Sequence, residues 1–166
     1  IGGGSTELMD HRGGGRSLDI GSVRFTERFL KSDPVTDAEF WACQAGLDSE
    51  IQTLRSWRAG LSDQDRLLGV AGTLTTLASW HLGLREFSRE RIDAAILTRG
   101  DVHRMVEELK WRTKVERATL PGVEEGRAGV ILAGALILWR VMEILDFGDC
   151  RVSTRGLRYG VLAAAL

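Results

Sequence analysis

The stretch from about Glu125 to Leu145 restricts the fold of this chain more than any other, because it is apolar on nearly every helical face. A helix of that kind must be covered on most sides by the rest of the protein. The apolar run 130–145 is too short to span a bilayer and carries Arg140 and Glu143, so no membrane partner is expected. The sequence therefore predicts a central buried helix, and a hydrophobic content of 43% can build a core around it.

Shorter elements are expected before and after that helix. Strand segments are predicted at residues 8–9, 17–20, 67–71 and 150–153, with the glycine-rich stretch 11–16 as a hairpin connection. Helices are predicted from a capping box at Thr36 and Glu39 to about Trp57, at 75–82, from a cap at Asp101 through Leu109, and at 155–166. Residues 23–30 are ambiguous and we favour a strand that runs into a short helix, 92–97 fit neither type, and 112–126 are linker-like.

This order of elements indicates an α/β fold with a mixed sheet flanked by helices, in a single domain over residues 1–166. The formal net charge of −1 lacks the basic field of a nucleic-acid-binding protein, so no nucleic-acid partner is expected. Cys43 and Cys150 are far apart and have no His or Cys neighbours at metal-ligand spacing. A zinc site is therefore not expected, and a reducing, cytoplasmic location is the default.

A first candidate site lies at the start of the chain, where Gly2, Gly3 and Gly4 precede Ser5, Thr6 and Glu7. Glycines let the backbone approach an anion closely, and successive N–H groups in such a turn form an anion-binding nest. A carboxylate belongs beside a phosphate only if a cation lies between them or if it handles a water. By itself such a run is more often a flexible turn, and a second glycine run at 13–15 shows that such turns recur here.

A second candidate site follows the strand predicted at 67–71. Gly72 and Thr73 stand there just before a predicted helix, whose first N–H groups have no partner within the helix. An ordinary strand-to-helix turn capped by a threonine would have the same sequence. Two such loops at strand ends in one small α/β domain favour a phosphate site.

Five blocks in order resemble the Ppx/GppA phosphatases, which are exopolyphosphatases and guanosine pentaphosphate phosphohydrolases: IGGGSTEL, SLDIGSVRFTERF, VAGTLTTLA, LPGVEEGRAGVILAGALIL and VSTRGLRYGVL. The resemblance runs from residue 1 to about 161. It implies a ribonuclease-H-like lobe of the actin-like ATPase superfamily, and specifically the C-terminal lobe of a two-lobe unit. The first lobe, with the glutamate that serves the family as catalytic base, has no counterpart in this sequence, nor has the aspartate expected just before Ile1.

The resemblance also assigns roles to particular positions. Glu7 matches the acidic residue that helps to hold a divalent cation, expected to be Mg²⁺, or to orient the attacking water. The phosphate-binding residues that it implies are Gly2, Gly3, Gly4, Ser5, Thr6, Gly72, Thr73 and Arg127.

The expected function is removal of terminal phosphate from polyphosphate or guanosine pentaphosphate, with this chain inactive by itself and a homodimer left open. A non-catalytic module that senses the same ligands, or a kinase-type lobe of the same superfamily, are the alternatives. Among the other polar residues, Asp19 is expected to pair with a nearby arginine and the three histidines to lie on helix faces or the surface. The five tryptophans are expected in the core or between lobes, and Arg155 and Arg158 at the surface or in a cleft.

Overall fold

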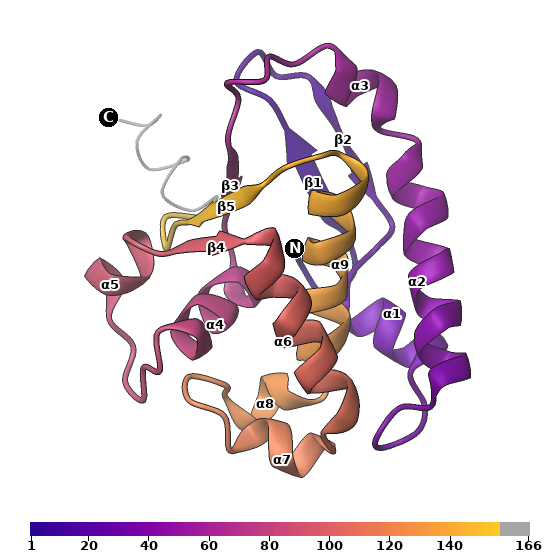
Figure 1. The fold of residues 1–166 in the computed structure, drawn as a ribbon, viewed down its shortest axis with the longest axis vertical. Coiled ribbons are helices and arrows are strands. Elements are labelled where there is room, and N and C mark those ends of the chain that lie inside the picture. Colours follow the sequence, from indigo (N-terminus) through magenta and orange to yellow (C-terminus); the bar gives the residue numbers. More distant parts are fainter. Residues whose placement is uncertain (157–166) are drawn as a thin grey trace.

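The computed structural model describes residues 1–156 (Figure 1). Its strands are β1 (Thr6–Met9), β2 (Gly15–Leu18), β3 (Leu67–Gly69), β4 (Ile96–Thr98) and β5 (Asp149–Val152). Its helices are α1 (Ser22–Phe29), α2 (Asp37–Gln52), α3 (Arg55–Ala59), α4 (Gly72–His81), α5 (Arg89–Asp93), α6 (Arg99–Trp111), α7 (Lys114–Ala118), α8 (Glu125–Ala128) and α9 (Ile131–Ile144). Most of the segment predicted as a helix at 155–166, including Arg158, lies outside the described residues.

The strands form an antiparallel hairpin and a three-stranded sheet. In the hairpin β1 pairs with β2, and Thr6 lies opposite Leu18. In the other sheet the order is β3-β5-β4, with β3 parallel and β4 antiparallel to β5, so this sheet is mixed. The prediction of an α/β fold with a mixed sheet flanked by helices is confirmed.

Helix α9 is the centre of the molecule, as its sequence predicts. Every residue from Ile131 to Leu138 is buried, and α1, α2, α4 and α6 all pack against it (Figure 1). The helix starts later than predicted, because α8 is a separate turn and Gly129 and Val130 come between the two. Two glycines close together, Gly126 and Gly129, weaken the helix there. No helix within residues 1–156 is long and apolar enough to cross a bilayer.

The strand predicted at the start of 23–30 is wrong, since α1 is helical over its full length. Its first N–H groups donate to carbonyls of the preceding glycine loop, a partner that local sequence does not reveal. Helix α2 begins with the predicted capping box, in which the Glu39 N–H donates to Thr36 Oγ1 at 3.3 Å and the Thr36 N–H to Glu39 Oε2 at 2.9 Å. It ends at Gln52 rather than near Trp57, which lies on α3.

Two further boundaries differ from the prediction. Residues 92–97, for which the sequence predicted neither helix nor strand, contain the end of α5 and the start of β4. Thr98, not Asp101, caps α6, and Asp101 is the third helical residue of a second capping box. A capping box places two polar residues three apart, and the sequence shows the pair without saying which member is the cap.

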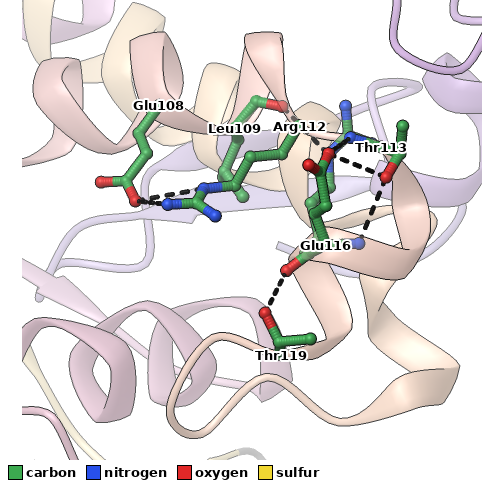
Figure 2. Close-up of polar contacts among 7 residues, drawn as sticks. Glu108, Leu109, Arg112, Thr113, Glu116 and Thr119 are labelled. Carbon is green, nitrogen blue, oxygen red and sulfur yellow. Dashed lines mark hydrogen bonds and ion pairs between the residues drawn. The ribbon is translucent and has the colours of Figure 1, made fainter.

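The linker predicted at 112–126 contains α7, which is anchored rather than flexible. Figure 2 shows its capping box, where the Thr113 N–H and hydroxyl donate to Glu116 Oε2 at 2.7 and 2.8 Å. Arg117 is buried and its Nε donates to the Leu109 carbonyl at 3.0 Å, which ties α7 to the end of α6. Burial also lowers the pKa of the Arg117 guanidinium. The polar composition of this segment therefore reflects caps, not disorder.

The contact between α4 and α9 requires a glycine. A Cβ at Gly134 would lie 2.6 Å from Thr73 Cγ2, closer than van der Waals contact allows. We expect Gly134→Ala to lower the free energy of unfolding by about 1–2 kcal/mol, because overpacking outweighs the better helix propensity of alanine. In a Thr73→Ser background, which removes the clashing methyl, the same change should cost less than about 0.5 kcal/mol. Urea denaturation of the four proteins measures the difference, and an equal cost in both backgrounds would contradict the packing argument.

Candidate active site

The first glycine loop is a tight turn whose carbonyls all face α1. The Gly2 N–H donates to the Ser5 carbonyl at 2.9 Å and closes the turn. The Gly2 carbonyl accepts from the Ser22 N–H at 2.9 Å, and the Gly3 carbonyl accepts from the N–H groups of Val23 and Arg24 at 3.0 Å each. The loop therefore rests on the start of α1 through its oxygen atoms.

Because the loop carbonyls face α1, the N–H groups of the loop point away from that helix. In a planar trans peptide the N–H of one residue points opposite to the carbonyl of the residue before it. Because the carbonyls of Gly2, Gly3 and Gly4 turn toward α1, the N–H groups of Gly3, Gly4 and Ser5 turn away from it. Within residues 1–156 these three N–H groups have no protein acceptor. Successive free N–H groups of this kind are suited to bind an anion.

Glu7 is connected to the loop by hydroxyl groups. Its Oε1 accepts hydrogen bonds from Ser5 Oγ at 2.6 Å and from Ser17 Oγ on β2 at 3.1 Å. The Ser5 bond is the largest cause of a lowered pKa of the Glu7 carboxyl; the Ser17 bond acts in the same direction, while partial burial opposes both. Thr6, by contrast, is buried and its hydroxyl donates to the Ile20 carbonyl at 2.6 Å, so it holds the hairpin instead of facing solvent.

The second loop brings Gly72 and Arg127 together. The Arg127 guanidinium lies so close to the Gly72 Cα that a Cβ there would be 2.2–2.4 Å from it. Its Nε is 3.6 Å from a Glu124 carboxylate that is itself 80% exposed, and 42% of the arginine side chain is open to solvent. Thr73 is buried against Gly134, so any anion at the start of α4 would meet its N–H rather than its hydroxyl.

The strand that follows the first loop and the strand that precedes the second loop line a common cavity. The start of β1 and the end of β3 line one small cavity of about 70 Å³, which includes Thr6, Glu7, Gly69 and Val70. Ala71 follows with φ of 75°, a conformation that is unusual for a residue with a side chain and that turns the chain into α4.

Outside the loops, the structure tests the predicted pairing of Asp19 and the predicted burial of the tryptophans. Asp19 Oδ1 lies 3.5 Å from Arg24 Nη2, so the predicted pairing of Asp19 with a nearby arginine is confirmed. Trp57 and Trp139 pack against the core, whereas Trp41 and Trp111 are 56% and 65% exposed and do not. Trp80 also packs against the core, so within residues 1–156 Trp41 and Trp111 are the two tryptophans that lie outside it.

Sequence reasoning missed Gly21 and Arg24. A Cβ at Gly21 would lie 2.2 Å from the Gly3 carbonyl oxygen, so only glycine lets the loop pack there. Arg24 Nε donates to the Gly4 carbonyl at 2.8 Å. The glycine after Ile20 was the available signal, since an isolated glycine at a strand end marks close approach of another backbone.

A family model described as the Ppx/GppA phosphatase family matches residues 1–166. The chain belongs to this family. Among characterised relatives it is 31% identical over 150 residues to exopolyphosphatase 2 of Mycobacterium tuberculosis, covering 83% of this chain and 44% of the relative. It is also 31% identical over 152 residues to a bifunctional 3-dehydroquinate synthase/phosphatase of Fusobacterium nucleatum, covering 89% of this chain and 22% of that protein.

Solved Ppx/GppA structures share the fold. A crystal structure of the Ppx/GppA phosphatase of Aquifex aeolicus superposes with a TM-score of 0.88 at 34% identity, over 98% of this chain and 54% of the other. An exopolyphosphatase of Cytophaga hutchinsonii gives 0.80 at 25% identity, over 99% and 55%. The actin-like ATPase fold implied by the sequence resemblance is confirmed. The chain spans about half the length of these family members.

The acidic groups present restrict how a metal could bind. Within residues 1–156 no three His, Cys, Asp or Glu side chains gather at ligand distance. Both serine hydroxyls donate to Glu7 Oε1, and within the described residues no side chain donates to Oε2, so one carboxylate oxygen beside the loop is open to a further ligand. Mg²⁺ commonly binds through one or two carboxylates, with substrate phosphates and waters as its other ligands. Glu7 fits that role as a single protein ligand and could not form a closed site.

The serine contacts predict how Glu7 titrates. We expect Ser5→Ala to raise the pKa of the Glu7 carboxyl toward its ordinary value, because a donor to the charged form is lost. Ser17→Ala should raise it less, since its hydrogen bond is the longer one. Carboxyl ¹³C NMR titration measures both changes. An unchanged midpoint in Ser5→Ala would show that the serine does not hold this carboxylate.

The close contact between Gly72 and Arg127 predicts a change in binding without a change in folding. Gly72→Ala should leave the free energy of unfolding within about 0.5 kcal/mol of wild type, because only the far end of a long side chain must move. Affinity for tripolyphosphate should fall about tenfold, as in Arg127→Gln. Gly126→Ala, with no atom near its Cβ, is the matched control. If Gly72→Ala still weakens binding in an Arg127→Gln background, the two positions do not act through one contact.

Proposed function

We propose that this chain is the C-terminal lobe of a two-lobe phosphoanhydride hydrolase that releases terminal phosphate from inorganic polyphosphate or guanosine pentaphosphate. The observation that carries the proposal is the glycine loop, whose three free N–H groups turn away from α1 while Glu7 is attached to the same loop through Ser5. Membership of the Ppx/GppA phosphatase family and the exopolyphosphatase names of its relatives support the choice of substrate.

Each group has a task that phosphoryl transfer requires. The transition state spreads charge over the phosphoryl oxygens, and catalysis consists mainly of positioning and of neutralising that charge. The N–H groups of Gly3, Gly4 and Ser5 would bind one phosphate. The planar guanidinium of Arg127, held beside Gly72, would donate to another, because its geometry suits phosphate oxygens.

Glu7 has a double role in this proposal. Its carboxylate stays ionised below the usual pKa, so it can orient a water or hold a cation over the physiological pH range. Mg²⁺, when bound, would supply positive charge to the phosphate oxygens. Two hydroxyl donors fix Oε1, which leaves Oε2 for the water or the cation.

Unpaired strand edges support the two-lobe arrangement. Within residues 1–156, β1 pairs only with β2 and β3 only with β5, so one edge of each strand is unpaired. A hollow of about 300 Å³ lies between them and is lined by apolar side chains of both, including Leu8, Met9 and Leu68. Met9 and Leu68 are 62% and 60% exposed. Unpaired edges beside exposed apolar side chains are suited to receive another strand. We propose that polypeptide outside this sequence fills the hollow and supplies the catalytic glutamate base.

The two buried, unpaired cysteines fit a reducing compartment, so we place the parent protein in the cytoplasm. Burial raises the pKa of both thiols to about 12, which keeps them unreactive.

The isolated chain should therefore release no phosphate from polyphosphate above background, since half of the positioning groups are absent. A chimera that joins the first lobe of the Aquifex aeolicus protein to Ile1 should hydrolyse polyphosphate or guanosine pentaphosphate in the presence of Mg²⁺. Glu7→Gln in the chimera should lower kcat by about 100-fold or more. Orthophosphate release measures all three, with the intact Aquifex protein as positive control.

Other outcomes would favour another function. Binding of polyphosphate by a folded chimera without any hydrolysis would indicate a sensing module. Transfer of phosphate from a nucleotide to an acceptor, without polyphosphate hydrolysis, would indicate a kinase-type lobe. Turnover by the purified 166-residue chain would contradict the two-lobe proposal.

A further inference from the structure

The carbonyls of the glycine loop are held by two different kinds of donor. Those of Gly2 and Gly3 accept from backbone N–H groups at the start of α1, which any residue except proline would supply. The Gly4 carbonyl accepts from a side chain, Arg24 Nε, at 2.8 Å. Among the hydrogen bonds between loop and helix, only this one and a longer one from Ser22 Oγ to the Gly2 carbonyl, at 3.4 Å, depend on the identity of a side chain, and the Gly4 carbonyl accepts from Arg24 alone within residues 1–156.

The Gly4 carbonyl matters because of the atoms on the other side of its peptide. The same peptide unit carries the Ser5 N–H, the last of the three that turn away from α1. Ser5 Oγ in turn donates to Glu7 Oε1 at 2.6 Å. A rotation of the Gly4–Ser5 peptide would therefore move one phosphate donor and the hydroxyl that fixes the carboxylate.

The surroundings of Arg24 place its guanidinium behind the loop. One of its Nη atoms lies 3.5 Å from Asp19, and half of the side chain is exposed. An open hollow of about 670 Å³ runs along this side, lined by the loop glycines, Arg24, Glu27 and Arg28. Because the guanidinium is on the carbonyl side of the loop, it is opposite to the free N–H groups.

We propose that Arg24 is a positioning residue that sets the direction of the Gly4–Ser5 peptide and so arranges the phosphate loop. The inference rests on the proposed function for the use of the loop, but the structural effect of Arg24 on the loop does not. Arg28 makes no contact with a loop carbonyl, although it lies one turn along α1 in the same hollow and carries the same charge. A comparison of variants at Arg24 and Arg28 therefore distinguishes positioning of the loop from electrostatic attraction of an anion.

The experiment compares ¹⁵N-labelled wild type, Arg24→Gln and Arg28→Gln, without ligand and with Mg²⁺ and tripolyphosphate. Arg24→Gln should shift and broaden the amide resonances of Gly3, Gly4 and Ser5 before ligand is added. It should weaken tripolyphosphate binding about tenfold, the effect of losing one charge-assisted hydrogen bond. Arg28→Gln should leave the loop resonances in place and change the affinity less than about twofold, as expected for an exposed charge.

Arg24→Lys tests the same point with less risk to folding. Lysine can donate to the Gly4 carbonyl but lacks the fixed planar geometry of arginine, so part of the affinity should return. Resonances of α9 serve as the fold control. If Arg24→Gln does not fold, the comparison of Arg24→Lys with Arg28→Lys decides, since only the first should perturb the loop amides.

Two results would overturn the inference. Equal loss of affinity in Arg24→Gln and Arg28→Gln, with unchanged loop resonances, would show that Arg24 acts only through its charge. Loop resonances that match wild type in ligand-free Arg24→Gln would exclude positioning whatever the ligand does. If tripolyphosphate fails to shift the loop amides of wild type, the proposed function of the loop is wrong, and the ligand-free comparison still decides the role of Arg24.

Discussion

Close packing around α9 is the constraint on which the rest of the structure depends. The helix is buried on nearly all sides, and at Gly134 the lack of a Cβ leaves room for a side chain of a covering helix. The helix that packs against Gly134 is α4, whose Thr73 side chain contacts it. This contact fixes the start of α4 and so the position of Gly72. The second loop thus takes its place from the core and not from its own sequence.

The first loop depends on a different helix in a different way. It adds no side chains to the core, and its glycine oxygens instead cap α1, which has no side-chain cap at Gly21. Helix and loop therefore satisfy each other: unpaired N–H groups of the helix meet carbonyls that the turn leaves free. The arrangement uses the start of α1 as a support and leaves a second set of N–H groups, those of the loop, for a ligand.

The sequence predicted well where one local rule decided the structure. The capping box at Thr36 and Glu39 and the all-round apolar character of α9 were both sufficient by themselves. The sequence predicted poorly where contacts with residues distant along the chain determine the local structure. Residues 23–30 contain β-branched and aromatic side chains that suit a strand, yet α1 is a helix whose first N–H groups donate to the loop carbonyls. Thr6 and Thr73 belong to the predicted phosphate-binding set, but the direction of a side chain depends on tertiary packing, and both are buried.

The two arginines near the loops show why residue type alone does not assign a role. Arg127 lies against a glycine Cα and is partly open to solvent, so its donors can reach a ligand. Arg24 uses its Nε on a carbonyl and faces away from the free N–H groups of the loop. Both place a positive charge beside a glycine loop. Only the partner of each guanidinium separates them: a carbonyl consumes a donor and orients the backbone, whereas an open guanidinium keeps its donors for phosphate.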